Sequence, residues 1–174
     1  MNNAVTIGVI TTPVGDLGAV LSATGLAYLT FAQQAVADCE AWVGRWMPQA
    51  QLADRLPLLE ELTHQLRAYF GGRRREFTIP LDLRGTAFQC EVWQALRHIP
   101  YGQVRAYSDL AAAIGRPRAV RAVGAANGAN PIPIIVPCHR LIGKSGSLIK
   151  YGGGLEIKRR LLALEGASIG GLHG

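Results

Sequence analysis

Alternating apolar and polar positions near the N-terminus predict a run of short strands. Three apolar segments, residues 5–10, 17–22 and 26–31, have the length of strands. They are separated by segments that contain Pro or Gly and are typical of turns, residues 12–16 and 23–25.

A helical period follows these strands. Apolar residues recur at near-helical spacing over residues 34–46 and again over residues 50–70, before Gly71 and Gly72 end the pattern. Residues 76–83 predict one further strand. Cys39 falls within the first helical pattern and is most simply a core residue. Nothing in this part of the chain resembles a catalytic motif.

The pattern after residue 84 is mainly helical. Thr86 is a candidate N-cap for a helix whose apolar face includes Phe88, Val92 and Leu96 and which ends before Pro100. Cys90 lies off this apolar face, with no basic residue placed beside it.

A helix-turn-helix pattern follows. Ser108 is a candidate cap for a helix over residues 109–114, a turn with Gly115 comes next, and residues 118–128 predict a second helix. This helix consists mostly of Ala, Gly and Arg, so its backbone can lie close to a groove. The pattern also fits an Ala-rich packing helix with two solvent-exposed arginines.

Composition limits the class of protein. The chain has 174 residues, 49% hydrophobic and 17% charged, which is enough to bury a core. No apolar run approaches the length of a membrane span, and the N-terminus has no signal-peptide pattern. Three widely spaced cysteines, Cys39, Cys90 and Cys138, support neither a disulfide framework nor a zinc ribbon. A reducing, cytoplasmic compartment is expected.

The net charge of +6 is unevenly distributed. Residues 1–80 contain six Lys/Arg and seven Asp/Glu, a net charge of −1, whereas residues 81–174 contain twelve and five, a net charge of +7. The second part is therefore expected to meet a polyanion, although a solvated basic surface has the same composition.

The segment that ends at Cys138 carries the candidate chemistry. An apolar run over residues 132–136 contains one proline and is flanked by two more. Cys138 comes directly after the last proline and is followed by His139 and Arg140. Proline restricts both its own backbone and the preceding residue, so we expect a rigid, largely buried segment. His139 and Arg140 are expected to favour the thiolate of Cys138, the reactive form. A buried, inert cysteine remains an alternative.

This segment, Asn-Pro-Ile-Pro-Ile-Ile-Val-Pro-Cys-His-Arg, resembles the active-site segment of the O6-alkylguanine-DNA alkyltransferases. The resemblance extends over residues 81–166 and more weakly over residues 12–31. It implies an α/β (α+β) fold, with a ribonuclease-H-like sheet-plus-helices domain over residues 1–83. A winged helix-turn-helix domain over residues 84–174 is expected to bind DNA and carry the alkyl transfer.

The resemblance also implies the reacting groups. Cys138 is expected to be the nucleophile, with His139 as its base and Glu165 orienting His139, the general arrangement of an activated nucleophile. Tyr107 is expected to donate a proton to the departing guanine. Asn130 is expected to hydrogen-bond within the Cys138 loop.

The DNA contacts follow from Arg-Ala-Val-Gly after Gly-x-Pro, which is similar to the family's recognition helix in the minor groove. By this resemblance, Arg121 replaces the nucleotide flipped out of the stack. The remaining residues expected on the DNA are Arg118, Ala122, Ala125 and Asn127.

The flipped base is expected in a pocket formed by Tyr107, Leu141, Tyr151 and Gly152. After Cys138 we expect a hairpin-like wing. Lys150 and Ala125 stand where glycines are common in the family. Lys158, with its two neighbouring arginines, is expected in solvent.

The expected reaction is that of a methylated-DNA–protein-cysteine S-methyltransferase that repairs DNA by direct reversal. The thioether product is not readily cleaved by water, so each molecule acts once. Neither a cofactor nor a metal is implied. The expected partner of the monomer is double-stranded DNA that contains O6-alkylguanine, with O4-alkylthymine as a further candidate; no membrane partner is expected.

Other classes share parts of this pattern. A winged-helix regulator would explain the basic half but not the cysteine motif. A non-reactive alkyltransferase-like binder would lack Cys138, and a transcription-activating relative would need a further metal-binding cysteine cluster. A Cys–His hydrolase would not need an Arg-bearing helix rich in Ala and Gly.

Overall fold

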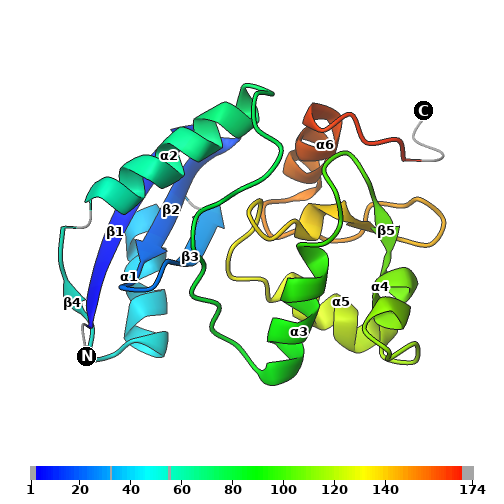
Figure 1. The fold of residues 1–174 in the computed structure, drawn as a ribbon, viewed down its shortest axis with the longest axis horizontal. Helices are drawn as coiled ribbons and strands as arrows, with labels where there is room; N and C mark the ends of the chain where they lie inside the picture. The colour runs from blue at the N-terminus through cyan, green and yellow to red at the C-terminus, as the bar shows by residue number, and fades with distance from the viewer. Residues whose placement is uncertain (1–2, 32, 55, 170–174) are drawn as a thin grey trace. The chain divides into compact units, whose positions relative to one another are not determined.

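The computed structural model describes residues 3–31, 33–54 and 56–169 of the chain. The chain divides into two compact units, Met1–Arg84 and Gly85–Gly174, coloured from blue to green and from green to red in Figure 1. The first unit combines a sheet with helices, and the second is mainly helical, so the predicted fold class is confirmed.

The first unit is built on a sheet with the strand order β3-β2-β1-β4. β1 (Ala4–Thr12), β2 (Gly15–Leu21) and β3 (Leu26–Phe31) are the three predicted strands, and they pair as an antiparallel meander. The short β4 (Gln51–Leu52) pairs in parallel with the start of β1.

The helix α1 (Ala35–Trp46) packs on this sheet at Gly18 of β2. A Cβ atom at Gly18 would lie 2.7 Å from the Ala35 carbonyl oxygen and 2.8 Å from Cys39 Sγ, so only glycine permits this approach. Cys39 is fully buried with Val5 and Val20, as expected of a core residue. Burial raises the pKa of the Cys39 thiol to about 12, so it is inert.

Two expectations for this unit were wrong. The second helix, α2 (Leu56–Phe70), does not begin at residue 50, because residues 51–53 bond to the start of β1 instead. Pairing with the sheet has overridden the local helical pattern. Residues 76–83 form a bridge between Leu81 and Leu26 of β3 in place of a strand. Pro80 in this segment has no N–H to extend a ladder.

The second unit begins with α3 (Ala87–Leu96), capped as predicted by Thr86. The Gln89 N–H donates to the Thr86 hydroxyl at 3.2 Å, and the Thr86 N–H donates to the Gln89 side chain at 2.9 Å. Trp93, 1% exposed, donates from Nε1 to the carbonyl of Ala126 at 2.8 Å and so ties α3 to the later helix α5 (Val120–Gly128).

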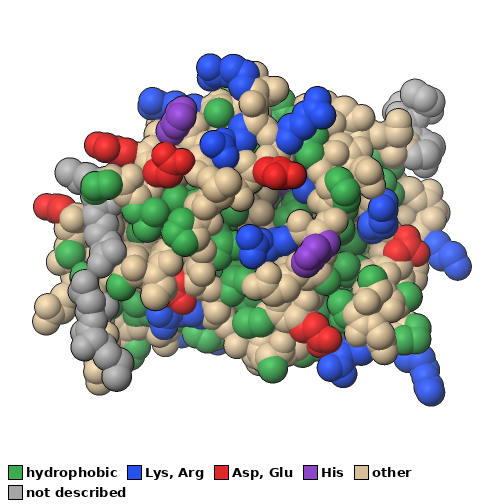
Figure 2. Space-filling view, in the orientation of Figure 1, with side chains coloured by type: hydrophobic (Ala, Val, Ile, Leu, Met, Phe, Trp, Pro, Cys, Tyr) green, Lys and Arg blue, Asp and Glu red, His purple; other side chains and the backbone are tan. Residues whose placement is uncertain are grey.

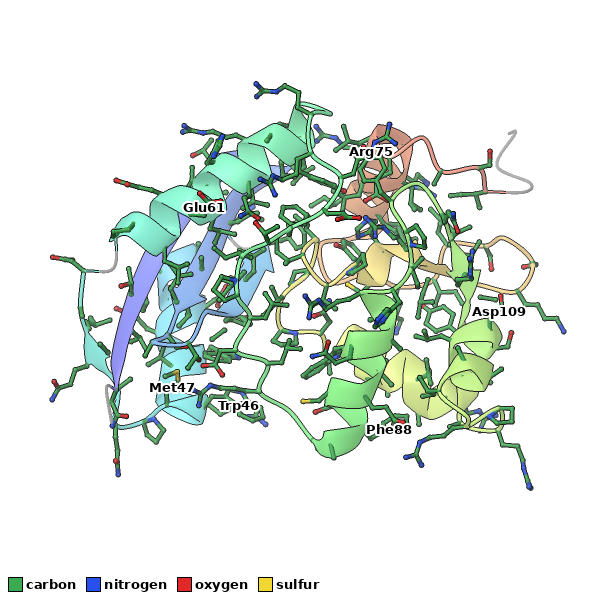
Figure 3. All side chains as sticks on the ribbon, in the orientation of Figure 1. Trp46, Met47, Glu61, Arg75, Phe88 and Asp109 are labelled. Atoms are coloured by element: carbon green, nitrogen blue, oxygen red, sulfur yellow. The ribbon has the colours of Figure 1, made fainter. Side chains whose placement is uncertain are left out.

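The helix-turn-helix consists of α4 (Tyr107–Ala113) and α5 (Val120–Gly128). Ser108 was wrongly expected to be the cap: it lies inside α4, and the Asp109 carboxylate accepts a hydrogen bond from the Ala106 N–H at 3.1 Å (Figure 3). Arg118 was wrongly placed in α5. It lies in the preceding turn, which is closed by the Ala119 N–H donating to the Arg116 carbonyl.

Cys138 opens the single 3₁₀ turn η1 (Cys138–Arg140), which leads into β6 (Leu141–Ile142). The hairpin expected here was wrong. β6 pairs in parallel with β5 (Arg105–Ala106), and residues 143–147 form a tight turn without a returning strand. The last helix is α6 (Leu155–Leu164). No helix within the described ranges is long and apolar enough to cross a membrane.

Candidate active site

The turn before Cys138 is held from inside by Asn130. Its Oδ1 accepts from the Ile132 N–H at 3.0 Å, and its Nδ2 donates to the Val136 carbonyl at 2.9 Å. Ile134 has a φ of 72°, a strained value for a β-branched residue that costs about 1–3 kcal/mol. Its side chain is 1% exposed, so the surrounding core maintains the conformation. Cys138 is therefore presented by a rigid turn.

The Cys138 thiol is buried, with 5% of the residue exposed. Burial raises its pKa, while hydrogen bonds from Asn130 and Tyr151 and the charge of Lys158 act in the opposite direction. The site therefore contains specific groups that stabilise the thiolate against the cost of desolvation.

His139 and Glu165 form a fully buried pair. His139 Nε2 lies 2.8 Å from Glu165 Oε1. Burial lowers the pKa of His139 by more than Glu165 raises it, so the ring is neutral near pH 7. Nε2–H then donates to the carboxylate and leaves the lone pair on Nδ1. Nδ1 has no hydrogen-bond partner among the described residues, so it can accept a proton.

Arg140 has a different role from the one expected. Its Nε and NH2 donate to the Glu165 carboxylate at 2.9 and 3.0 Å, and its NH1 donates to the Ile99 carbonyl at 2.6 Å. Burial alone would raise the pKa of Glu165, but the bonds from His139 and Arg140 hold it well below its ordinary value. Arg140 thus keeps Glu165 ionised; the expectation that it favours the thiolate of Cys138 is not supported by these contacts.

Gly102 is a functional residue that the sequence analysis missed. Its N–H donates to Glu165 Oε2 at 3.2 Å, and its φ is 75°. A Cβ atom here would lie 2.8 Å from the Glu165 carbonyl oxygen. Its position after Pro100 and Tyr101 suggested only a turn.

Lys158 was also missed, because the expectation that it lies in solvent was wrong. It is 0% exposed, and its Nζ donates to the carbonyls of Leu141 at 2.6 Å and Ile149 at 3.3 Å. Its spacing from the buried Leu161 and Leu162, three and four residues on, could have indicated the inner face of α6. Glu165 continues the same face.

A cavity of about 530 Å³ lies beside α4 and α5. Tyr107 lines it together with Gly124 and Asn127 of α5, and Ile149 and Lys150 form a further part of its wall. A Cβ atom at Gly124 would lie 3.8 Å from the Tyr107 ring, an ordinary contact distance, so the ring packs directly over this part of α5.

The other expected pocket residues lie elsewhere. Leu141 is fully buried and Tyr151 is half-buried beside Cys138, whereas Gly152 is exposed. Within the described chain, the cavity lining includes Tyr107 but none of these three residues.

Tyr107 lines the cavity and also lies near Cys138. Burial raises the pKa of its phenol, the charge of Cys138 raises it further, and a hydrogen bond from Asn127 opposes both. Asn127 was expected on the DNA, but it is 5% exposed and lies toward Tyr107. The residue faces inward because it lies on the buried face of α5 together with Val123 and Ala126.

The outer surface of the helix-turn-helix carries arginines and, between them, small side chains. Arg121, Ala122 and Ala125 of α5 are exposed, as is Arg118 in the turn before it. Blue Lys and Arg side chains project at the right of Figure 2, over the part that α4 occupies in Figure 1. The Arg116 guanidinium lies 5.7 Å from the ring centroid of Phe88, which Figure 3 labels on α3.

The fold and the site define a class: a protein with a helix-turn-helix unit and a buried cysteine directly before a buried His–Glu pair. Family models agree with this. The model of the 6-O-methylguanine DNA methyltransferase DNA binding domain matches residues 87–167, and that of the ribonuclease-like domain of the same proteins matches residues 5–83.

Relatives give the same result. The inducible methylated-DNA–protein-cysteine methyltransferase of Bacillus subtilis is 46% identical over 81% of this chain and 79% of its own length. The Mycolicibacterium paratuberculosis protein of that name is 62% identical over 58% of this chain and 61% of its own. The structure of Mycobacterium tuberculosis OGT in complex with DNA has a TM-score of 0.78 and 43% identity, over 94% of this chain and 92% of that one. The chain belongs to the methylated-DNA–protein-cysteine methyltransferase family.

Proposed function

We propose that this protein repairs O6-alkylguanine in double-stranded DNA by moving the alkyl group from guanine O6 to Cys138. The observation that carries the proposal is the placement of a cysteine immediately before a buried, neutral histidine whose Nε2 is bound to an ionised Glu165. Membership of the family supports the same reaction.

The chemistry follows from these groups. Glu165 holds the proton on His139 Nε2, so Nδ1 takes the proton of the Cys138 thiol through a water molecule. The thiolate then attacks the alkyl carbon in line: the S–C bond forms, the C–O6 bond breaks and the electron pair remains on O6. Tyr107 donates a proton to the departing guanine. The product is a thioether, so each molecule reacts once.

Access to O6 requires the nucleotide to leave the stack. We propose that α5 enters the minor groove, where its exposed Ala122 and Ala125 permit close approach and Arg121 fills the space left by the flipped nucleotide. Arg118, in the turn before α5, is placed to contact a phosphate. The structure of the M. tuberculosis relative in complex with DNA supports DNA as the partner.

The work is divided between the two parts of the chain. Residues 84–174 bind DNA and react, and residues 1–83 serve as a structural domain. The cytoplasm is the proposed compartment, because a reactive thiol requires a reducing environment.

The test is intact mass after incubation with duplex DNA that carries O6-methylguanine. We expect wild type to gain one methyl group, located on Cys138 by peptide mapping. The Cys138→Ser variant should gain none, whereas Cys90→Ser, which changes a half-buried cysteine outside the site, should behave as wild type. DNA binding without any gain of mass would refute the transfer and favour a lesion sensor.

A further inference from the structure

The buried ammonium group of Lys158 has no part in the proposed reaction. The Leu141 and Ile149 carbonyls accept hydrogen bonds from this group but carry no net charge. A buried cation also requires an opposing charge, or it loses its proton.

The acids around Lys158 leave one candidate for that opposing charge. The Glu165 carboxylate, on the same face of α6, already pairs with the Arg140 guanidinium, and His139 is neutral. The phenols of Tyr107 and Tyr151 near Cys138 are weak acids. Cys138 remains: it is buried like Lys158, the Lys158 ammonium is bonded to the carbonyl of Leu141 three residues after it, and charges on the two groups favour one another.

The two carbonyls that bind Lys158 belong to two different parts of the site. Leu141 directly follows the turn that carries Cys138, and its strand pairs with the residues that lead into Tyr107. Ile149 lines the cavity. One ammonium group therefore joins the reactive turn to the cavity wall.

We propose that Lys158 is a positioning residue of this site: it supplies the counter-charge of the Cys138 thiolate and holds the reactive turn against the Ile149 wall of the cavity. This inference rests on the proposed function in one respect, namely that Cys138 is the nucleophile.

The first test compares the rate at which iodoacetamide alkylates Cys138 near neutral pH, measured by peptide mass. Lys158→Gln retains N–H donors without charge, and Lys158→Met retains neither. Both should react about 10-fold more slowly than wild type, because an opposite charge nearby lowers a thiol's pKa by about one unit or more. Lys158→Arg should restore most of the rate. Arg159→Gln, at an exposed neighbouring position, should match wild type.

If Cys138 of Lys158→Gln is alkylated at the wild-type rate, the proposed counter-charge role is overturned, since only the charge is lost in this variant. Slower alkylation in Lys158→Met but not in Lys158→Gln would also overturn it, because the effect would then belong to the hydrogen bonds of Lys158.

The second test leaves Lys158 in place and so does not depend on whether its variants fold. The chain has three lysines, so each Nζ can be followed by NMR titration. Cys138→Ser removes the group that can become an anion beside Lys158, so it should lower further the pKa of Lys158, which burial already lowers to about 8. Lys144 and Lys150 serve as internal controls. An unchanged Lys158 titration would overturn the proposal.

Neither test uses DNA, so failure of the proposed function is separately visible. A protein that passes both tests yet gains no methyl group from damaged DNA would retain the Lys158–Cys138 pair and lose the repair assignment.

Discussion

Replacing Glu165 by glutamine should destabilise the second unit and slow the reaction. The Glu165 side chain is 0% exposed and is the charge partner of Arg140, whose side chain is 7% exposed. Glu165→Gln retains the shape but leaves the buried guanidinium without a counter-charge. Breaking a buried pair in this way costs about 3–5 kcal/mol. Methyl transfer should also slow by about 100-fold or more, because the His139 tautomer is no longer fixed.

The loss of stability in Glu165→Gln should depend on pH in a defined direction. The pKa of Glu165 is held well below its ordinary value in the folded protein, so ionisation contributes stability above the unfolded value of about 4.3. That contribution is lost as the pH falls toward the folded value. The difference in stability between wild type and Glu165→Gln should therefore be full at neutral pH and narrow in acid.

The assay is urea denaturation at neutral and acid pH, with Glu156→Gln as the control. Glu156 lies on the same helix, its side chain is 78% exposed, and it is 3.9 Å from Arg159. The control should unfold within about 0.5 kcal/mol of wild type. A Glu165→Gln variant as stable as the control at neutral pH would refute the counter-charge argument.

Three further predictions test other contacts. Arg121→Ala should weaken repair of duplex DNA far more than reaction with free O6-benzylguanine, and equal losses in the two rate assays would mean that Arg121 does not replace the flipped nucleotide. Tyr107→Phe should slow methyl transfer by about 100-fold, measured by quenched single-turnover assays, with the Kd for undamaged duplex unchanged; an unaltered rate would exclude the phenol as proton donor. Trp93→Phe removes the bond to Ala126 and should cost about 1–3 kcal/mol in urea denaturation; no loss would show that this bond does not stabilise α5.

Sequence patterns predicted those elements whose residues form them locally. The meander needs only alternating apolar residues and turns, and α3 needs only its cap and its apolar face, so both were predicted within a few residues. The helix-turn-helix was recognised for the same reason, although Ser108 and Arg118 were misplaced by the short turns at its helix ends.

Errors arose where a distant partner decided the backbone. Gln51 and Leu52 lie in a sequence with a helical pattern but pair with β1. Leu81 forms a single bridge to β3 in place of the expected strand. The expected hairpin after Cys138 was replaced by pairing with β5. In each case hydrogen bonds to a remote strand outweighed the local preference.

The sequence alone determined that Cys138 and His139 lie together in a constrained turn, because the two residues are adjacent and the prolines before them restrict the chain. Only the tertiary structure decided their electrostatics. Glu165 lies 26 residues from His139 along the chain, and its contact there depends on the packing of α6 against η1. The same packing buries Lys158 and turns Arg140 toward Glu165, because a charged group taken out of water must find its partner among whichever residues the fold brings within reach.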